Sequence, residues 1–310
     1  YLNQVEFKKS QQKNLTSYEG IGAVVDFRDS RFTIFSVMSD GPAQKAGLKR
    51  DDVILEIDGE PVYLSNSNEA VKKLKGPSGT RVTLLIQRSR ELEPRDIVVT
   101  RGTINMPTVD MSLLPSSVGY LYIREFQDHT LDEVLEVLET FNELDTLGII
   151  LDLRNNHNGG IEVARDVGAQ FLPDGLFLYE IDGNNKRTDM FIEAGGTLTE
   201  GSELVVLINK GTAQAAEALA GSLQDAGVGI VIGDRSKGLG STNIYSELSN
   251  GGAILLPVSY WYTPSGRSII IDGIVPDINA SLSKEDFALN RDSQLKEAYD
   301  YLDKRLPAFR

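Results

Sequence analysis

The sequence predicts a mixed fold of the α/β class, with some α+β character, built from two modules. After residue 103, strands alternate with helices. The run 204–208 is continuously apolar, as in a strand buried on both faces of a sheet, and 147–153 is expected to be a buried parallel strand. Before residue 103, short strand-like runs are separated by turn residues, which is typical of a small β-rich module. We therefore expect a β-rich module at 18–103 and an α/β core at 104–310, with residues 1–17 packing on the core.

Composition and charge narrow the functional classes. Among 310 residues, 45 are acidic and 31 are basic, so the formal net charge is −14, which argues against nucleic acid and anionic membrane surfaces as main partners. The sequence has no cysteine, which excludes disulfides, thiolate metal sites and a cysteine nucleophile. Its two histidines, His129 and His157, are too few for a histidine-rich metal site. We expect no metal and no cofactor, and no apolar run reaches the length of a membrane span.

The N-terminal part is expected to begin with a helix. Within residues 1–17 this helix is polar, with Val5 and Phe7 as its apolar contacts, and a linker follows at 13–17. The turn signal Asp58-Gly59 should close one strand of the β-rich module. The strands are expected at 20–27, 32–37, 52–57, 82–86 and 96–100, and the helices at 43–47 and 66–75.

One segment of this module carries a recognisable signature. Residues 41–54 read Gly-Pro-Ala-Gln-Lys-Ala-Gly-Leu-Lys-Arg-Asp-Asp-Val-Ile, which is closely similar to the G-P-A-x-x-A-G-[LI]-x-x-G-D-x-I signature of bacterial PDZ domains, with Asp51 in place of one glycine. In such domains a peptide C-terminus adds as a strand to a sheet edge, and backbone N–H groups of a glycine-containing loop hold its carboxylate. The resemblance implies that role for the loop Gly20, Ile21, Gly22 and Ala23. The alternative is that these glycines only shape a turn.

The core is expected to alternate strands and helices. Thr130, or Asp128 before it, should cap its first helix, and Thr212 is a plausible N-cap of its third. His129, at the start of the first helix, is interpreted as structural. Strands are expected at 118–123, 147–153, 204–208, 229–232, 252–257 and 258–262, and helices at 131–144, 162–171, 213–225 and 283–302.

Two segments of the core resemble the active site of a protease family. Residues 209–217 read Asn-Lys-Gly-Thr-Ala-Gln-Ala-Ala-Glu, and residues 233–243 read Gly-Asp-Arg-Ser-Lys-Gly-Leu-Gly-Ser-Thr-Asn. They are similar to N-x-G-[ST]-A-S-A-S-E and G-x-x-[ST]-F-G-K-G-x-V-Q, the nucleophile and lysine segments of the carboxyl-terminal processing peptidases, also called tail-specific proteases. These are Ser/Lys proteases with an inserted PDZ domain, so the resemblance implies a ClpP/crotonase-like protease core.

The side chains at the positions that carry the chemistry depart from this family. The nucleophilic serine falls on Gln214, the general-base lysine on Leu239 and the orienting glutamine on Asn243. Glutamine has no hydroxyl that could act as a nucleophile, and leucine cannot accept a proton. In this alignment, therefore, the family's Ser/Lys mechanism is absent.

A displaced dyad is the alternative. Thr212 and Lys237 are 25 residues apart, the same spacing as Gln214 and Leu239. Two residues along a helix turn a side chain through about 200°, so Thr212 would not point where the family's serine points. The competing interpretation is that Thr212 is an N-cap and Lys237 a solvated loop lysine.

A second loop is also altered. Residues 152–160 read Asp-Leu-Arg-Asn-Asn-His-Asn-Gly-Gly and resemble the family's D-L-R-x-N-P-G-G, whose glycine pair supplies one oxyanion-hole donor. The resemblance makes Gly159 and Gly160 the candidates for this role, although His157 and Asn158 intrude before them. A displacement of about 1 Å would cost much of such a donor's benefit.

His157 has two interpretations of its own. It is either a general base that serves Thr212, Ser236 or Ser241, or a loop histidine hydrogen-bonded to backbone.

Three hypotheses about function follow. The first is a non-catalytic homologue that binds C-terminal tails of exported or unfolded polypeptides, or that partners an active paralogue. The second is an endopeptidase that cuts near C-termini with Thr212 and Lys237, and the third is a structural subunit for oligomerisation. Residues 1–7 resemble a family segment that normally follows an exported leader, so we expect a truncated chain and an extracytoplasmic location, in the periplasm or cell envelope.

Overall fold

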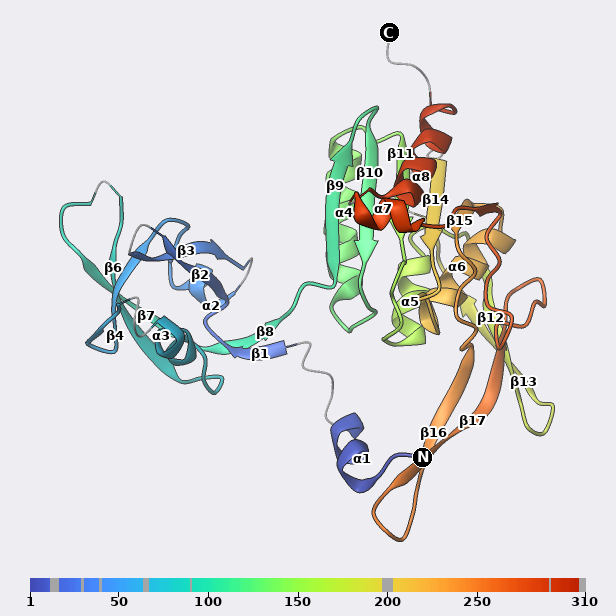
Figure 1. Ribbon diagram of the computed structural model, residues 1–310, viewed down its shortest axis with the longest axis horizontal. Coiled ribbons are helices and arrows are strands. Elements are labelled where there is room, and N and C mark those ends of the chain that lie inside the picture. The colour runs from blue at the N-terminus through green and yellow to red at the C-terminus, as the bar shows by residue number, and fades with distance from the viewer. Residues whose placement is uncertain are drawn as a thin grey trace. The chain divides into compact units, whose positions relative to one another are not determined.

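The chain divides into two compact units in a computed structural model (Figure 1). Unit 1 comprises residues 1–11 and 107–310, and unit 2 comprises residues 12–106. The expected linker at 13–17 lies, apart from Ser17, outside the described residues. The structure describes residues 1–11, 17–28, 31–38, 41–63, 67–89, 91–196, 203–289 and 291–306.

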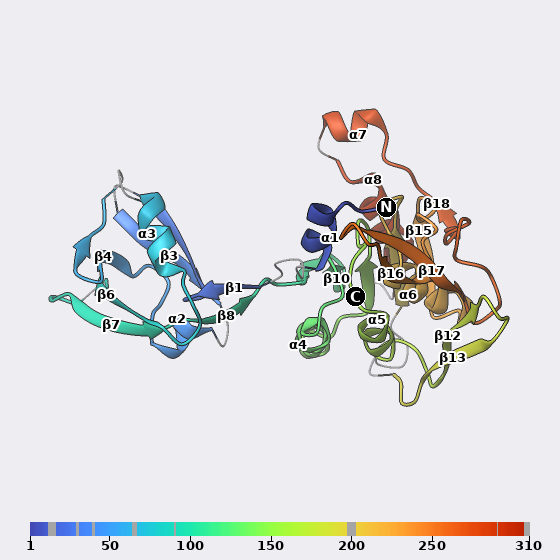
Figure 2. The same cartoon turned by 90° about the horizontal axis from the view of Figure 1, so that it is seen from below.

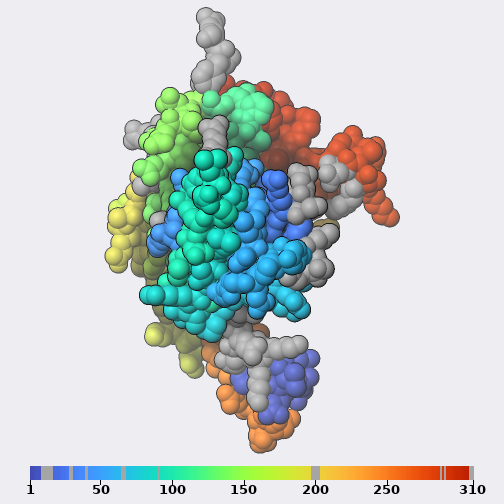
Figure 3. Space-filling view, turned by 90° about the vertical axis from the view of Figure 1, so that its left-hand side faces the viewer, coloured from blue at the N-terminus to red at the C-terminus, as the bar shows by residue number. Residues whose placement is uncertain are grey.

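Unit 2 is a small β-rich fold, and its surface runs from mid-blue to teal in Figure 3, while the dark blue atoms belong to residues 1–11 of unit 1. Its main sheet has the order β2-β3-β4-β6-β7, with β5 paired to β4, while β1 pairs with β8. The strands are β1 Ser17–Gly20, β2 Ala23–Arg28, β3 Arg31–Val37, β4 Val53–Ile57, β5 Glu60–Pro61, β6 Arg81–Gln87, β7 Arg95–Thr100 and β8 Gly102–Asn105. The helices are α2 Pro42–Lys45 and α3 Ser67–Leu74.

Backbone conformation explains where these elements begin and end. The single strand expected at 20–27 is wrong, because the chain breaks between β1 and β2 at Gly22, whose φ of +71° is open to glycine but rarely to other residues. The Asp58-Gly59 turn has positive φ at both residues, as a type I′ hairpin turn requires. In β6, the apolar side chains of Val82, Leu84 and Ile86 are fully buried in the core of unit 2.

The larger sheet of unit 1 has the order β18-β15-β14-β11-β10-β9. Neighbouring strands run parallel except for β9, which is antiparallel to β10. The strands are β9 Val109–Leu114, β10 Val118–Ile123, β11 Gly148–Asp152, β14 Glu203–Ile208, β15 Gly229–Gly233 and β18 Ile278–Asn279.

Helices cover both faces of this sheet. One hydrophobic cluster joins it to α4 Thr130–Glu143, α5 Ile161–Gly168 and α6 Ala215–Asp225, and a second joins its other face to α8 Ser293–Asp303. The strand β14 is buried along Leu204–Ile208, which agrees with its continuous apolar sequence. This three-layer arrangement confirms the expected mixed α/β character.

A second sheet of unit 1 has the order β13-β12-β17-β16 and forms two hairpins, which Figure 2 shows from another side. Helix α1, Gln4–Gln11, packs its Phe7 ring 5.4 Å from that of Tyr245, but Val5 is 67% exposed, so one of the two expected contacts of this helix is wrong. The strands are β12 Gly175–Asp182, β13 Arg187–Ile192, β16 Ser241–Glu247 and β17 Ala253–Tyr262.

Three further sequence expectations are wrong. The strands expected at 252–257 and 258–262 form the single strand β17. Pro257 is tolerated within it because β12 pairs only with Ser259–Tyr262, so that among the described residues no strand pairs with Pro257 on that side. The helix expected at 283–302 is two helices, α7 Lys284–Ala288 and α8, because Asp292 caps α8 by accepting from the Leu295 N–H.

The third concerns α4, whose N-cap is His129 and not Thr130 or Asp128. Thr130 is instead the first helical residue, and its hydroxyl oxygen accepts from the Gln127 N–H.

Candidate active-site cleft

The turn between β14 and α6 places Gln214 in a strained conformation. Its φ of 54° and ψ of −120° fall in a region that residues with a side chain rarely adopt. Helix α6 begins directly after it, so Gln214 is the N-cap and the expected Thr212 cap is wrong. A sharp, strained turn from a buried strand to a helix is the arrangement that nucleophile elbows use to expose one side chain.

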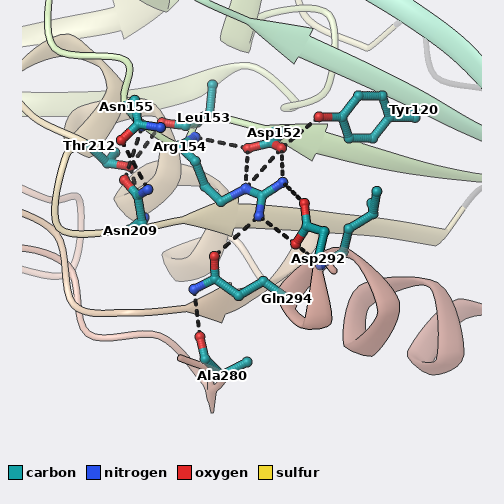
Figure 4. Close-up of polar contacts among 11 residues, drawn as sticks. Tyr120, Asp152, Leu153, Arg154, Asn155, Asn209, Thr212, Ala280, Asp292 and Gln294 are labelled. Atoms are coloured by element: carbon teal, nitrogen blue, oxygen red, sulfur yellow. Dashed lines mark hydrogen bonds and ion pairs between the residues drawn. The ribbon is translucent and has the colours of Figure 1, made fainter. Parts of the chain in front are cut away.

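Thr212 faces the interior and does not line the cleft. Its buried hydroxyl donates to the Leu153 carbonyl at 2.8 Å and accepts from the Asn209 N–H at 3.0 Å (Figure 4). The exposed Lys237 is joined to Thr212 through the backbone, since its N–H donates to the Thr212 carbonyl at 2.9 Å.

A buried carboxylate connects the elbow to the loop that follows β15. Glu217 is fully buried and accepts from the N–H groups of Gln214 and Leu239, both at 2.9 Å. It also accepts from the Gly238 N–H at 2.6 Å and the Ser236 hydroxyl at 2.5 Å. These four bonds fix the two segments relative to each other.

Sequence reasoning missed the role of Glu217. The available signal was its place three residues after the N-cap, where a glutamate reaches back to the N-cap N–H.

A cleft of about 820 Å³ opens above the elbow, and it brings together several residues that the sequence singled out. Gln214, Asn243 and Gly159 all line it, as does Ser241. Leu239 does not, and its side chain is 39% exposed. The amide of Asn243 donates to the carbonyl and the hydroxyl of Ser241, both at 3.1 Å, so it is held against its own strand.

Three residues near the elbow have backbone N–H groups of interest: Ala215 follows Gln214 in the chain, Gly159 lines the cleft, and Gly160 comes next after Gly159. Gly160 is engaged, since its N–H donates to the Phe126 carbonyl at 3.0 Å. Within the described residues, no hydrogen-bond partner meets the N–H of Gly159 or that of Ala215, the first residue of α6. Only glycine fits at Gly159, because its φ is +116° and a Cβ there would lie 2.1 Å from the Phe126 carbonyl oxygen. Two such donors suit a carbonyl oxygen or oxyanion.

His157 and Ser236 do not line the cleft. The ring Nδ1 of His157 lies 2.7 Å from the Asn155 carbonyl, and the side chain is exposed. The Ser236 hydroxyl accepts from the Ile274 N–H at 2.6 Å while it donates to Glu217.

The Asp152-Leu153-Arg154 segment anchors the second loop instead of lining the cleft. Arg154 donates to Asp152 at 2.6 Å, to Asp292 at 2.8 Å and to Gln294 at 3.2 Å, which ties the end of β11 to α8 (Figure 4). Burial favours a neutral Arg154, but these bonds to the two carboxylates outweigh burial, raise the guanidinium pKa and keep it charged. Burial and the neighbouring Asp152 raise the pKa of Tyr120, which donates to that carboxylate.

Unit 2 has a smaller hollow of about 40 Å³ between β2 and α3. The candidate peptide-binding residues Ile21, Gly22 and Ala23 line it. Lys75, at the end of α3, places its Nζ 5.2 Å from the centroid of the Tyr18 ring. The other lining residues are Tyr18, Val25, Val71, Leu74 and Lys75.

Neither a metal cluster nor a membrane helix is found in the described part of the chain. No three His, Cys, Asp or Glu side chains there are placed to hold a metal ion. No helix there is both long and apolar enough to cross a bilayer.

Two family profiles match the chain. Peptidase family S41 matches residues 117–280, more than half of the chain, and a PDZ domain matches residues 33–88. The chain is 32% identical over 283 residues to the carboxy-terminal processing protease CtpA of Bacillus subtilis (91% of this chain, 60% of that protein). It is 34% identical over 283 residues to the carboxy-terminal-processing protease of Bartonella bacilliformis (90% and 65%). The chain thus spans about three fifths of the length of these relatives.

Solved structures show the same fold. The photosystem II D1 C-terminal processing protease aligns with 90% of this chain and 77% of its own, with a TM-score of 0.54 and 24% identity. The tricorn protease aligns with 93% of this chain and 29% of its own, with a TM-score of 0.57 and 17% identity. The predicted resemblance to carboxyl-terminal processing peptidases is therefore confirmed at the level of the family.

Proposed function

Since the chain belongs to peptidase family S41 and contains a PDZ domain, we propose that it binds polypeptide C-terminal tails without hydrolysing them. The observation that carries this proposal is Gln214, which stands in the strained elbow at the mouth of the cleft. Its amide donates and accepts hydrogen bonds but forms no acyl intermediate, and Leu239 offers no amine to take a proton.

The geometry around Thr212 supports the absence of a displaced dyad. Its hydroxyl is buried and already hydrogen-bonded on both its donor and acceptor sides, while Lys237 reaches it only through backbone. A nucleophile needs access to substrate and a base within hydrogen-bond reach, and Thr212 has neither among the described residues.

Tail binding is supported by the free edge of β2. This strand is the first in its sheet, so one of its edges has no neighbouring strand among the described residues. Ala23 pairs with Val37, and Met38 donates to the Gly22 carbonyl, a pattern that turns the N–H of Ala23 away from β3. An incoming tail would add to this edge, with its last side chain in the hollow beside Val71.

Hydrolysis is tested by incubating the protein with an unfolded substrate that bears an apolar C-terminal tail, with products identified by mass spectrometry. We expect no cleavage. Cleavage that disappears in both Thr212→Ala and Lys237→Ala would contradict the proposal and establish the displaced dyad.

Tail binding is tested with a fluorescein-labelled peptide that ends in an apolar residue with a free carboxylate. We expect binding that weakens at least tenfold when the carboxylate is amidated or when Val71→Glu places a charge in the hollow. Val98→Glu makes the same change at an exposed site on β7 and should bind like the wild type. Equal binding of the free and amidated peptides would rule out carboxylate capture.

We propose an extracytoplasmic setting, in which an active paralogue would be a partner of this chain. The resemblance of residues 1–7 to a segment of the carboxyl-terminal processing peptidases supports this location. Fractionation of cells that produce the full-length protein tests it, and recovery of all protein in the cytosol would refute it.

A further inference from the structure

A groove continues from the cleft along the outer edge of β13. The cleft adjoins a second hollow of about 330 Å³, and the two share Arg165, Phe191 and Glu193. One wall of this groove comes from α5 and the other from β13 and the residues that follow it. The groove therefore extends well beyond Gln214.

The backbone of β13 faces this groove. Every residue from 188 to 194 contributes to its lining, although side chains of a strand alternate between two faces. Because consecutive residues line the groove without a gap, the edge of the strand, and not one of its faces, borders the groove. Within the described residues, β13 pairs only with β12.

Half of the β13 backbone groups point toward the groove side. The Asp182 N–H donates to the Lys186 carbonyl at 3.1 Å, which sets the phase of the β12–β13 ladder. In that phase the N–H and C=O of Arg187 and Asp189 point away from β12. Such an open edge is a template for an added strand.

The groove is acidic. Glu162 on α5 and Glu193 after β13 line it, and neither carboxylate has a cationic partner among the described residues. Glu180 also lines it and accepts from the hydroxyls of Thr242 and Ser259. The cation Arg165 is already paired with Asp166 at 2.7 Å. The groove therefore presents uncompensated negative charge to an incoming ligand.

We infer that this groove binds an extended polypeptide segment rich in lysine or arginine, added as a strand along β13. This inference rests on the proposed function and assigns a class of ligand to the cleft of unit 1. Backbone hydrogen bonds to the strand edge supply affinity, and Glu162 and Glu193 select basic side chains. A second copy of this chain is disfavoured as the occupant, because each copy carries a net charge of −14.

The probe is a fluorescein-labelled nonapeptide that alternates arginine and valine and ends in an amide. The amide removes the carboxylate that unit 2 would capture, so binding reports on the groove. Fluorescence anisotropy should show affinity that falls at least fivefold in Glu162→Gln and in Glu193→Gln. Glu143→Gln, an equally conservative change at an exposed position of α4, should leave affinity unchanged.

Strand addition is tested by changing the peptide and not the protein, so that misfolding of a protein variant cannot explain the result. Methylation of alternate backbone nitrogens removes the donors that would pair with β13, and it should weaken binding at least tenfold. Replacing every arginine with glutamate should abolish binding. Equal binding of the methylated or acidic peptide, or unchanged affinity in both glutamine variants, would overturn the inference.

The two binding sites are separated by Val71→Glu. This variant should lose the apolar tail and keep the amidated basic peptide. If it loses the basic peptide as well, the groove is not the site and the inference fails, while tail binding by unit 2 stands.

Discussion

Gln214 shows that backbone geometry and side-chain chemistry are separable at this elbow. A non-glycine residue with positive φ costs on the order of 1–3 kcal/mol unless the surroundings impose it. Here the Gln214 N–H donates to Glu217, and the N–H groups of Gly159 and Ala215 have no hydrogen-bond partner among the described residues. The arrangement that would serve a nucleophile persists around a side chain that is not one.

Restoring the missing groups should therefore restore hydrolysis. The triple variant Gln214→Ser, Leu239→Lys and Asn243→Gln supplies a hydroxyl, an amine and an orienting amide at the aligned positions. We expect cleavage of an unfolded, apolar-tailed substrate by the triple variant, measured by mass spectrometry. The single variant Gln214→Ser is the control and should be inactive. A folded but inert triple variant would show that the donors at Gly159 and Ala215 are misplaced.

Glu217 should be a large contributor to stability. Glu217→Gln keeps the shape but places an NH₂ group among four donors, so buried N–H groups lose their acceptor. We expect the free energy of unfolding of unit 1 to fall by about 3 kcal/mol in denaturant titrations. Glu139→Gln on the exposed side of α4 should change it by less than about 0.5 kcal/mol. A Glu217→Gln variant as stable as that control would contradict this role.

At the level of single residues, the sequence motifs predicted several residues that line the cleft. Spacing within three motifs placed Gln214, Asn243 and Gly159, and all three residues line one cleft. The motif could not reveal Glu217 as a four-fold acceptor, because three of its donors come from another segment. It also misplaced the cap of α6, because the positive φ of Gln214 moves the helix start two residues beyond Thr212.

Elements with strong periodicity were the predictable ones. The apolar run of β14 and the helical spacing of α4 were both found close to their expected limits. The β12–β13 hairpin was missed, because Arg187–Ile192 is mostly exposed and carries no clear alternation. That hairpin forms one wall of the groove, so without it the sequence did not indicate the basic ligand that we infer for the groove.

The link between β11 and α8 should depend on pH. Burial alone would raise the pKa of Asp292, but hydrogen bonds from Arg154 and the Leu295 N–H outweigh it and hold that pKa below its usual value. A carboxyl with a depressed folded pKa stabilises the fold above its unfolded pKa of about 3.9, and this contribution is lost as pH falls through the folded value.

The stability difference between the wild type and Asp292→Asn should thus be constant near neutral pH and shrink below about pH 4. Urea titrations across this range measure it. Asp132→Asn, on the exposed side of α4, makes the same change away from Arg154 and provides the comparison. A difference that grows as the solution becomes more acidic would reverse the assigned sign.

The whole molecule contains separate hydrophobic cores. The core of unit 2 shares no residue with the two clusters that flank the large sheet of unit 1. Each unit therefore has its own apolar burial to stabilise it. Sequence alone indicated two modules through the change from short strands to strand-helix alternation.

We expect two unfolding transitions as a result. Leu84→Ala, in the core of unit 2, should lower the stability of one transition by about 3 kcal/mol and leave the other in place. Leu121→Ala, in the core of unit 1, should act on the other transition to a similar extent. Calorimetry separates the two, and a single transition that both variants shift would refute independent units.

Gln214 also determines whether activity-based reagents for serine hydrolases can label this protein. Reagents that reveal serine hydrolases do so by acylating or phosphorylating the active-site oxygen, and position 214 has no such oxygen. Under the proposed function, these reagents should not label this protein, however abundant it is. On the same basis, the protein would instead be detected by affinity capture on immobilised C-terminal tails, because such capture depends on binding and not on catalysis.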